Sequence, residues 1–514
     1  MDRVLILDFG SQVTQLIARR IRNKGVYCEI HPYNISQKKI KLFSPKALVL
    51  SGGPSSTTLK KPLEPDSSIF NLQIPILGIC YGHQILCKNL GGKVISSKRR
   101  EFGKAYITIK NKSNIFDGIN KKNKEHQVWM SHGDKVNKLP KGFTVIASTS
   151  NAKFAAVGDE KKNFYGLQFH PEVVHTLQGE KIIENFVKKI ARCKSSWKMS
   201  NFIKKSTQEI KKEVQNNNVI CALSGGVDSS VATALLYNAI GKQLKCVFVD
   251  TGLLRKGEGD EIEKVFKQRF GKNFKRINAE KFFLNKLKKV SNPEDKRKII
   301  GKAFIDIFSK ESKKYKSAKY LVQGTLYPDV IESRSVKGAP SAKIKSHHNV
   351  GGLPKKLKFK LIEPLKELFK DEVRVLGKKL KVPDFIINRH PFPGPGLAVR
   401  IPGYVTKEKI KVLQGADKIF IDQLKEKKLY TKIWQAFAVL LPVKTIGVMG
   451  DQRSYEYTCA LRAVTSVDGM TAEPFFFKPE DLAEISTKIV NEVKGINRVV
   501  YDYTSKPPGT IEWE

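Results

Sequence analysis

"ALSGGVDSSVA", residues 222–232, lies between the apolar run "NVIC" and the helix-forming run "TALLYNAIG". This order predicts a strand, a glycine-containing turn and a helix, which is the pattern of α/β folds. Successive backbone N–H groups at such a turn face an anion, so the stretch predicts a phosphate-binding loop. No lysine follows the last glycine, whereas a Walker-type loop uses Gly-Lys-Ser/Thr to hold the terminal phosphates. The loop therefore fits transfer of a γ-phosphoryl group poorly.

The side chains of this loop suit a different bond of the nucleotide. Ser224 and Ser229 add hydroxyl donors, and Asp228 adds a carboxylate that can hold Mg²⁺ against phosphates. The loop resembles the pyrophosphate loop of the N-type ATP pyrophosphatases, which cleave ATP between its α- and β-phosphates. The resemblance implies ATP as cofactor and an adenosine pocket lined in part by Val249, in "VFVDTGLLR". The ATP-binding residues it implies in the loop are Ser224, Gly225, Gly226, Val227, Asp228, Ser229 and Ser230.

Two later stretches, "QGTLYPDVIES" (323–333) and "IKSHHNVGGLP" (344–354), resemble the lid of the same family and its supports. The paired histidines would otherwise suggest a metal site, but no third histidine, cysteine or carboxylate cluster lies at ligand spacing. Zinc is therefore not expected. Positive groups near the phosphates would offset the charge that develops on leaving pyrophosphate. The residues that the resemblance places around the phosphates and the adenylated intermediate are Asp329, Glu332, Lys345, His347, His348, Lys370 and Asp371.

A second reactive feature lies in "IPILGICYGHQILC", residues 74–87, where Cys80 stands between Gly78 and Gly82. Glycines on both sides permit a sharp turn between a strand and a helix, which exposes the cysteine as a nucleophile elbow does. The start of the helix favours the thiolate, which is the reactive form of cysteine. The stretch therefore predicts a nucleophilic cysteine that still needs a base.

The expected base is His170 in "FYGLQFHPE", residues 164–172. Residues i and i+2 of a strand project to one face, so Glu172 can orient the His170 imidazole toward Cys80. Backbone N–H groups of "LSGGPSS" (50–56), with the N–H of Tyr81, are placed to form an oxyanion hole.

The cysteine elbow and the His-Pro-Glu strand resemble the class I glutamine amidotransferases. The resemblance implies that Cys80 attacks the side-chain amide of glutamine and that His170, oriented by Glu172, is the general acid and base. It also implies that the amides of Gly53 and Tyr81 stabilise the oxyanion. Three further residues in motifs similar to those of the family would bind glutamine: Gln84, His132 and Asp134.

By the same resemblance, attack on the side-chain amide gives a thioester and releases ammonia. The last part of the chain indicates which molecule accepts this ammonia. "RHPFPGPGLAVRI", "GVMGDQRSYEYTCALRAVTSVDGMTA" and "SKPPGTIEWE" resemble the glutamine-hydrolysing GMP synthases, and the resemblance extends over essentially the whole chain. It implies adenylation of the C2 oxygen of xanthosine 5′-monophosphate (XMP), displacement of AMP by ammonia, and a homodimer formed through this part. The residues that it implies for XMP binding are Arg462, Lys506, Thr510, Ile511 and Glu512.

The chain of 514 residues is too long for one hydrophobic core, so several domains are expected. Alternating strands and helices fill the first part, and the polar stretch "CKSSWKMSNFIKKS" indicates a linker. We expect an α/β class I glutamine amidotransferase domain at 1–193. A doubly wound parallel-sheet ATP pyrophosphatase domain is expected at 194–389, and an α+β dimerisation domain at 390–514.

Charge and composition bear on partners and on compartment. The net charge is +44, which suits anionic small substrates as well as nucleic acid. Basic runs are spread over the whole chain without an aromatic stacking pattern, so nucleic acid is not the expected partner. No apolar run approaches the roughly 20 residues that cross a bilayer, and no membrane partner is expected. Seven cysteines without any Cys-x-x-Cys indicate the reducing cytoplasm.

Two alternatives share part of this chemistry. NAD synthetases also join glutamine hydrolysis to adenylation, but with a nitrilase-type Glu-Lys-Cys amidase rather than an elbow cysteine. tRNA-thiolating enzymes share the pyrophosphate loop and would suit the basic charge, but need sulfur-carrying cysteines near it. Cys221 and Cys246 are the nearest candidates, and both lie in apolar runs that predict core strands.

Overall fold

The computed structural model describes residues 1–119, 125–315, 317–334, 359–449, 452–466, 469 and 471–514. These residues form two compact units. The first holds residues 1–204 with 326–334, and the second holds the remaining described residues from 205 onward. The division falls inside helix α5 (Met199–Val214). The domain boundaries expected at 193/194 and 389/390 stay predictions.

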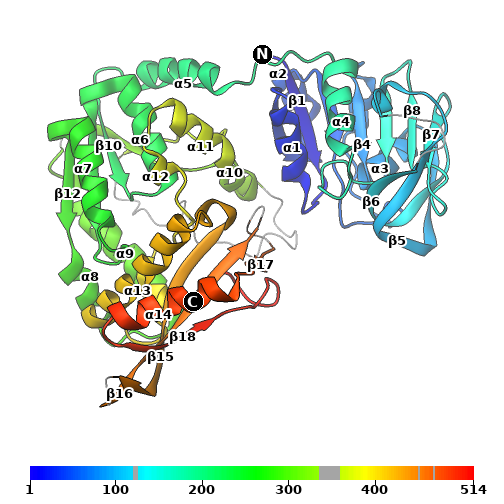
Figure 1. Ribbon diagram of the computed structural model, residues 1–514. Coiled ribbons are helices and arrows are strands. Elements are labelled where there is room, and N and C mark those ends of the chain that lie inside the picture. The colour runs from blue at the N-terminus through cyan, green and yellow to red at the C-terminus, as the bar shows by residue number, and fades with distance from the viewer. Residues whose placement is uncertain (120–124, 316, 335–358, 450–451, 467–468, 470) are drawn as a thin grey trace. The chain divides into compact units, whose positions relative to one another are not determined.

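The first unit is built on one nine-stranded sheet in the order β2-β1-β3-β4-β9-β8-β7-β5-β6. The first five strands of this order are parallel, and the others join antiparallel (Figure 1, blue to cyan). The short parallel strands are continuous apolar runs because both faces of a parallel sheet are covered. The strands are β1 (Arg3–Asp8), β2 (Tyr27–Pro32), β3 (Ala47–Leu50), β4 (Ile76–Ile79), β5 (Lys93–Ile109), β6 (Glu125–Lys138), β7 (Thr144–Ser148), β8 (Ala156–Asp159) and β9 (Phe164–Leu167).

Helices connect the parallel strands of this unit, and one helix reaches it from much later in the chain. Helix α10 (Tyr327–Arg334) packs against β2, where the Tyr327 hydroxyl accepts a hydrogen bond from the Ile30 N–H. The Arg22 guanidinium lies 4.7 Å from the centre of the Tyr327 ring, within cation–π range. The other helices are α1 (Thr14–Asn23), α2 (Gln37–Phe43), α3 (Tyr81–Asn89) and α4 (Gly179–Glu184), which continues as a π-helix over Asn185–Ile190.

The second unit begins with a five-stranded sheet in the order β12-β11-β10-β13-β14, and all its pairings are parallel. This confirms the parallel α/β sheet expected around the glycine-rich loop. The loop follows β10, where the strand order changes direction, and such a switch point is the usual ligand site of these sheets. The elements are β10 (Asn218–Leu223), β11 (Leu244–Asp250), β12 (Phe274–Asn278), β13 (Ala318–Val322), β14 (Lys360–Ile362), α6 (Val227–Ile240), α7 (Glu258–Phe270), α8 (Glu280–Leu287), α9 (Pro293–Ser312), α11 (Lys370–Lys379) and α12 (Asp384–Ile387).

The rest of the second unit is an α+β arrangement around a long antiparallel ribbon (Figure 1, orange to red). One continuous hydrophobic core joins it to the parallel sheet, since residues such as Val247 of β11 and Phe420 of α13 belong to the same cluster. The elements are α13 (Lys407–Glu426), β15 (Gln435–Met449), β16 (Gln452–Thr465), β17 (Glu473–Pro474), α14 (Pro479–Glu492) and β18 (Ile496–Tyr501).

The longest helices, α9 and α13, each have 20 residues, and charged side chains occur along both. Within the described part of the chain, no helix is both long enough and apolar enough to cross a membrane.

Candidate active sites

Cys80 lies at the turn from β4 into α3, in the strained backbone conformation of a nucleophile elbow. Its φ is 52° and its ψ is −105°, which residues other than glycine rarely adopt. The Cys80 N–H donates to the carbonyl of Leu167 at 2.7 Å, which ties the turn to the adjacent β9. The thiol is thereby fixed at the N-terminus of α3, where it donates a hydrogen bond to the carbonyl of Ser131 at 3.2 Å.

The two glycines that flank Cys80 are required by close backbone packing. A Cβ at Gly78 would lie 2.5 Å from the carbonyl oxygen of Gly82, and a Cβ at Gly82 would lie 2.2 Å from that of Leu50. Both distances are shorter than atoms tolerate. The Gly-x-Cys-x-Gly pattern therefore has a direct steric cause, as the sequence indicated.

His170 and Glu172 form a buried pair beside Cys80. The Nδ1 atom of His170 lies 2.8 Å from Oε1 of Glu172, whose side chain is fully buried. Burial opposes the charged imidazolium, but the Glu172 carboxylate and the Cys80 side chain outweigh it, and the pKa of His170 is raised well above its usual range. The imidazolium is thus available as a proton donor at neutral pH.

Other residues hold this pair in place. The carbonyl of Glu172 accepts a hydrogen bond from Nε of Arg20 in α1 at 3.1 Å, and the carbonyl of His170 accepts one from the Thr176 hydroxyl at 2.6 Å. At Gly52, a Cβ would lie 3.0 Å from Cε1 of His170, so a side chain there would press on the imidazole. Arg20 and Gly52 were not among the expected site residues.

The expected oxyanion-hole residues border the elbow from two sides. Tyr81 is the first residue of α3, so its N–H has no acceptor within the helix. Gly53 follows β3, and a Cβ there would lie 2.7 Å from the carbonyl of Phe9. Their role toward an oxyanion stays a prediction.

The three residues expected to bind glutamine are joined in one buried network. Nε2 of Gln84 donates to the Asp134 carbonyl at 2.9 Å, and Nδ1 of His132 lies 3.0 Å from the same oxygen. The Asp134 carboxylate accepts hydrogen bonds from the Thr57 N–H and the Ser56 hydroxyl. Their role toward glutamine stays a prediction.

Glu101 of β5 also belongs to this network. Its carboxylate lies 3.3 Å from Nε2 of His132 and accepts a hydrogen bond from the Thr149 hydroxyl. Sequence reasoning missed Glu101, because no local pattern indicates a pairing 31 residues away.

The loop after β10 has the shape of an anion cradle. Gly225 has φ +76°, which strains any other residue, and a Cβ there would lie 2.2 Å from Cδ1 of Ile262, so that side chain would have to shift. The Ser224 and Ser229 hydroxyl oxygens lie 2.9 Å apart. The Gly226 N–H lies 3.3 Å from the Ser224 oxygen, and the cradle leads directly into α6.

Asp228, in the first turn of α6, is paired with a residue expected at the same site. Its Oδ2 lies 2.9 Å from Nζ of Lys370, the first residue of α11. Arg389 closes the other side of the loop, since its guanidinium donates to the Gly225 carbonyl at 3.2 Å and pairs with Glu258. The structure thus brings Asp228 and Lys370 together, although 142 residues separate them.

The remaining residues expected around ATP are placed as follows. Val249 is buried near the end of β11, and Ser230 is buried in α6. Asp329 accepts a hydrogen bond from the Leu326 N–H at 2.8 Å and lies in α10 of the first unit. Asp371 follows Lys370 in α11. Residues or side chains outside the described part are Glu332 (side chain only), Lys345, His347 and His348.

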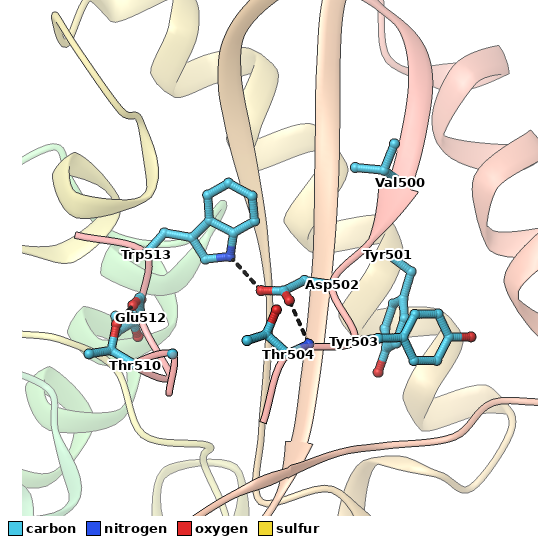
Figure 2. A pocket seen from close by; sticks show the side chains of 9 residues that line it. Val500, Tyr501, Asp502, Tyr503, Thr504, Thr510, Glu512 and Trp513 are labelled. Carbon is cyan, nitrogen blue, oxygen red and sulfur yellow. Dashed lines mark hydrogen bonds between the residues drawn. The ribbon is translucent and has the colours of Figure 1, made fainter. Parts of the chain in front are cut away.

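The residues expected to bind XMP gather around one segment of the second unit. Thr510 and Glu512 line a cavity of about 490 Å³ together with Asp502 and Trp513 (Figure 2). Nε1 of Trp513 donates to the Asp502 carboxylate at 3.0 Å.

Arg462 and Lys506 lie outside the lining of this cavity and bind other parts of the chain. The guanidinium of Arg462 is fully buried and donates to the carbonyls of Ile511 and Thr510. The Lys506 ammonium donates to the Gly469 carbonyl at 2.8 Å.

Three families match successive parts of the chain. Residues 5–190 match the family described as glutamine amidotransferase class-I, residues 217–280 match the tRNA methyl transferase HUP domain, and residues 422–513 match the GMP synthase C terminal domain. Together with the elbow cysteine and the anion cradle, these matches define a class I glutamine amidotransferase fused to an ATP-using synthetase.

Relatives of known name match from end to end. The glutamine-hydrolysing GMP synthase of Rhizobium etli is 56% identical over 513 residues, which is 100% of this chain and 99% of the relative. Those of Sinorhizobium fredii and Brucella ovis are 56% and 55% identical over 514 residues, with the same coverage. The chain belongs to the glutamine-hydrolysing GMP synthases.

Proposed function

We propose that this chain forms GMP from XMP with nitrogen from glutamine, in a reaction driven by ATP. The observation that carries the proposal is the 56% identity to a glutamine-hydrolysing GMP synthase along the whole chain. Hydrolysis of glutamine releases ammonia. ATP adenylates the C2 oxygen of XMP and loses pyrophosphate, and ammonia then displaces AMP to give GMP.

In the amidase half of the reaction, Sγ of Cys80 attacks the side-chain carbonyl carbon of glutamine. The His170 imidazole takes the proton of the Cys80 thiol as Sγ attacks, and the imidazolium so formed gives this proton to the departing ammonia as the C–N bond breaks. The raised pKa of His170 suits this role. Glu172 orients the imidazole and stabilises its charge. The N–H groups of Gly53 and Tyr81 stabilise the oxyanion, and a water molecule then hydrolyses the thioester to glutamate.

In the synthetase half, the 224–230 loop holds the phosphates and Asp228 serves a Mg²⁺ ion. The donor set fits this ion, because Oδ2 of Asp228 pairs with Lys370 whereas Oδ1 has no hydrogen-bond partner among the described residues. Mg²⁺ usually combines one or two carboxylates with substrate phosphates, so Asp228 would hold it there, and the bound ion would supply positive charge near leaving pyrophosphate. Lys370 is placed to move from Asp228 to the phosphates.

XMP occupies the cavity along residues 500–513 in this proposal. Thr510 and Glu512 line it, while Arg462 fixes their segment by bonding its carbonyls. A nucleoside monophosphate is dianionic, so Lys506 is suited to its phosphate. The lid residues keep the roles that the family resemblance implies.

One assay tests this function against its alternatives. The protein is incubated with XMP, ATP, Mg²⁺ and glutamine, and GMP, AMP and pyrophosphate are quantified. We expect pyrophosphate release that depends on XMP and equals the GMP formed. Release with nicotinic acid adenine dinucleotide or with tRNA in place of XMP would instead support one of the two alternative classes.

We further propose that the chain pairs with a second copy through the β15–β16 ribbon. Ile446 and Val448 project from one face of β15, Tyr455 lies opposite Ile446 on β16, and all three are at least 65% exposed. An exposed apolar face of this kind indicates a protein interface. Light scattering is expected to give twice the mass of one chain, and Val448→Glu should shift it toward a single chain. An unchanged mass for this variant would place the interface elsewhere.

The cytoplasm is the compartment that we propose for the protein. All seven cysteines are free and buried in the structure, although Cys221 and Cys246 lie opposite one another in adjacent strands. Free thiols are typical of a reducing compartment.

A further inference from the structure

Residues 510–514, called the strap below, are held by three cations whose side chains are all fully buried. These cations are Lys296, Arg400 and Arg462. A buried cation is tolerated only where acceptors satisfy its charge and its N–H groups. The strap supplies acceptors to all three, although Arg462 also pairs with Asp502 outside the strap at 2.8 Å. Arg297, which is only partly buried, donates to the main-chain oxygen of Glu514 as well.

The two arginines bind the first half of the strap. Nε of Arg462 donates to the Ile511 carbonyl at 2.8 Å, and Nη2 donates to the Thr510 carbonyl at 3.0 Å. Arg400 forms a two-point pair with the Glu512 carboxylate at 2.9 and 3.1 Å. Thr510, Ile511 and Glu512 are the strap residues expected to contact XMP. The two arginines therefore fix the main chain and the Glu512 side chain of that site.

Lys296 binds the far end of the strap and has no part in the chemistry described above. It lies in α9, and its Nζ donates to the carbonyls of Ile401 at 2.8 Å and Ala398 at 3.2 Å. Its third bond goes to the carboxylate of Glu514. One ammonium group therefore joins α9, the Pro- and Gly-rich segment 390–403, and the strap.

We infer that Lys296, through its ion pair with Glu514, is a positioning residue for the XMP site. This inference rests on the proposed function, because it takes the strap to carry the XMP contacts. Lys296 never touches the nucleotide. Its pair with Glu514 keeps the strap ordered before XMP arrives.

The inference predicts an effect on XMP affinity rather than on turnover. If the strap is released, only a fraction of molecules is ready to bind, and the apparent dissociation constant rises by the inverse of that fraction. Bound XMP would reorder the strap, so the maximal rate would change little. ATP binds at the 224–230 loop, away from the strap. The KM for ATP, measured at saturating XMP, should therefore stay unchanged.

The test is Lys296→Met in the full chain, assayed for GMP formation over ranges of XMP and ATP. Methionine keeps the length of the side chain but leaves the Glu514 carboxylate without its cation. We expect the KM for XMP to rise at least tenfold, with kcat and the KM for ATP within about twofold of the unsubstituted protein. A KM for XMP within twofold, in a protein that melts cooperatively, would overturn the inference.

Three further variants separate positioning from loss of stability. Lys298→Met, two residues along α9 with a side chain 65% exposed, is the matched control and should leave every constant unchanged. Glu514→Gln keeps an acceptor for Lys296 and should raise the KM for XMP about threefold. The double variant Lys296→Met with Glu514→Gln should have a lower KM than Lys296→Met alone, because no orphan charge remains.

The outcomes distinguish a failure of the inference about Lys296 from a failure of the proposed function. If Lys296→Met does not fold, Glu514→Gln decides, and an unchanged KM for XMP there overturns the inference. If the unsubstituted protein forms no GMP from XMP, the proposed function fails before any variant is compared.

Discussion

Cys80→Ala is expected to abolish GMP formation from glutamine while leaving GMP formation from added ammonia intact. Alanine lacks the sulfur that forms the thioester, and loss of a catalytic nucleophile typically lowers the rate by roughly 10³-fold or more. The methyl group fits the space of the thiol and adds no strain at the positive φ of 52° beyond what Cys80 already bears. The measurement is GMP formed from XMP and ATP, with glutamine or with ammonium chloride as the nitrogen source.

Cys87→Ala provides the matched control for this experiment. Cys87 lies in α3, the helix that follows Cys80, but burial raises the pKa of its thiol to about 12, so it stays protonated and unreactive. This variant should use glutamine as well as the unsubstituted protein does, with at most about 1 kcal/mol lost from the free energy of unfolding. Glutamine-dependent synthesis that survives Cys80→Ala would assign the nucleophile to another residue. Loss of the ammonia-dependent rate would show that the two sites do not work independently.

The two loops that we propose to carry the chemistry could be predicted because their glycines stand in short stretches between a strand and a helix. Gly78 and Gly82 flank Cys80 since any Cβ would collide with backbone within the same turn or the next strand. Gly225 is needed for its positive φ and its contact with Ile262. The atoms that Gly82 and Gly225 would meet belong to Leu50 and Ile262, which are distant in the sequence. The glycines themselves nevertheless stand within short strand–turn–helix stretches, and that local pattern can be read from the sequence.

The parts that were missed depend on contacts between distant residues. Glu101 supports His132 across a β-ribbon, and Arg20 supports the carbonyl of Glu172 from α1. A lone glutamate or arginine in a chain this rich in charge carries no local signal of its partner. Composition and spacing also gave no reason to expect that α10, with Asp329, packs in the first unit.

The residues expected around XMP show an intermediate case. Family resemblance selected Arg462, but only the structure shows its guanidinium buried and bonded to the carbonyls of the strap. The residues of the motif "TIEWE" therefore form hydrogen bonds within the protein, to Arg400 and Arg462, in addition to any contact with a ligand. Lys296 also binds the strap through a buried cation, but no sequence motif indicates it. Its partners lie about 100 and 218 residues away in the sequence.

Asp228→Asn is expected to abolish GMP formation from both glutamine and ammonia, by roughly 10³-fold or more. The asparagine keeps the shape of the side chain but removes the charge that pairs with Lys370 and that, in the proposed function, would hold Mg²⁺ against the phosphates. Because adenylation of XMP precedes nitrogen transfer, the nitrogen source should make no difference. The measurement is XMP-dependent pyrophosphate release, repeated over a range of Mg²⁺ concentrations.

Asp260→Asn is the control for Asp228→Asn, since Asp260 also lies in the first turn of a helix that follows a strand of the same sheet. Its side chain is 80% exposed and pairs with Arg276 rather than with a residue of the loop. It should retain nearly full activity, which would exclude a general effect of removing a helix N-terminal charge. Pyrophosphate release by Asp228→Asn at the unsubstituted rate would remove Asp228 from the metal site. Release restored only by high Mg²⁺ would place its role in metal affinity, because a weakened site fills when the free ion concentration exceeds its new dissociation constant.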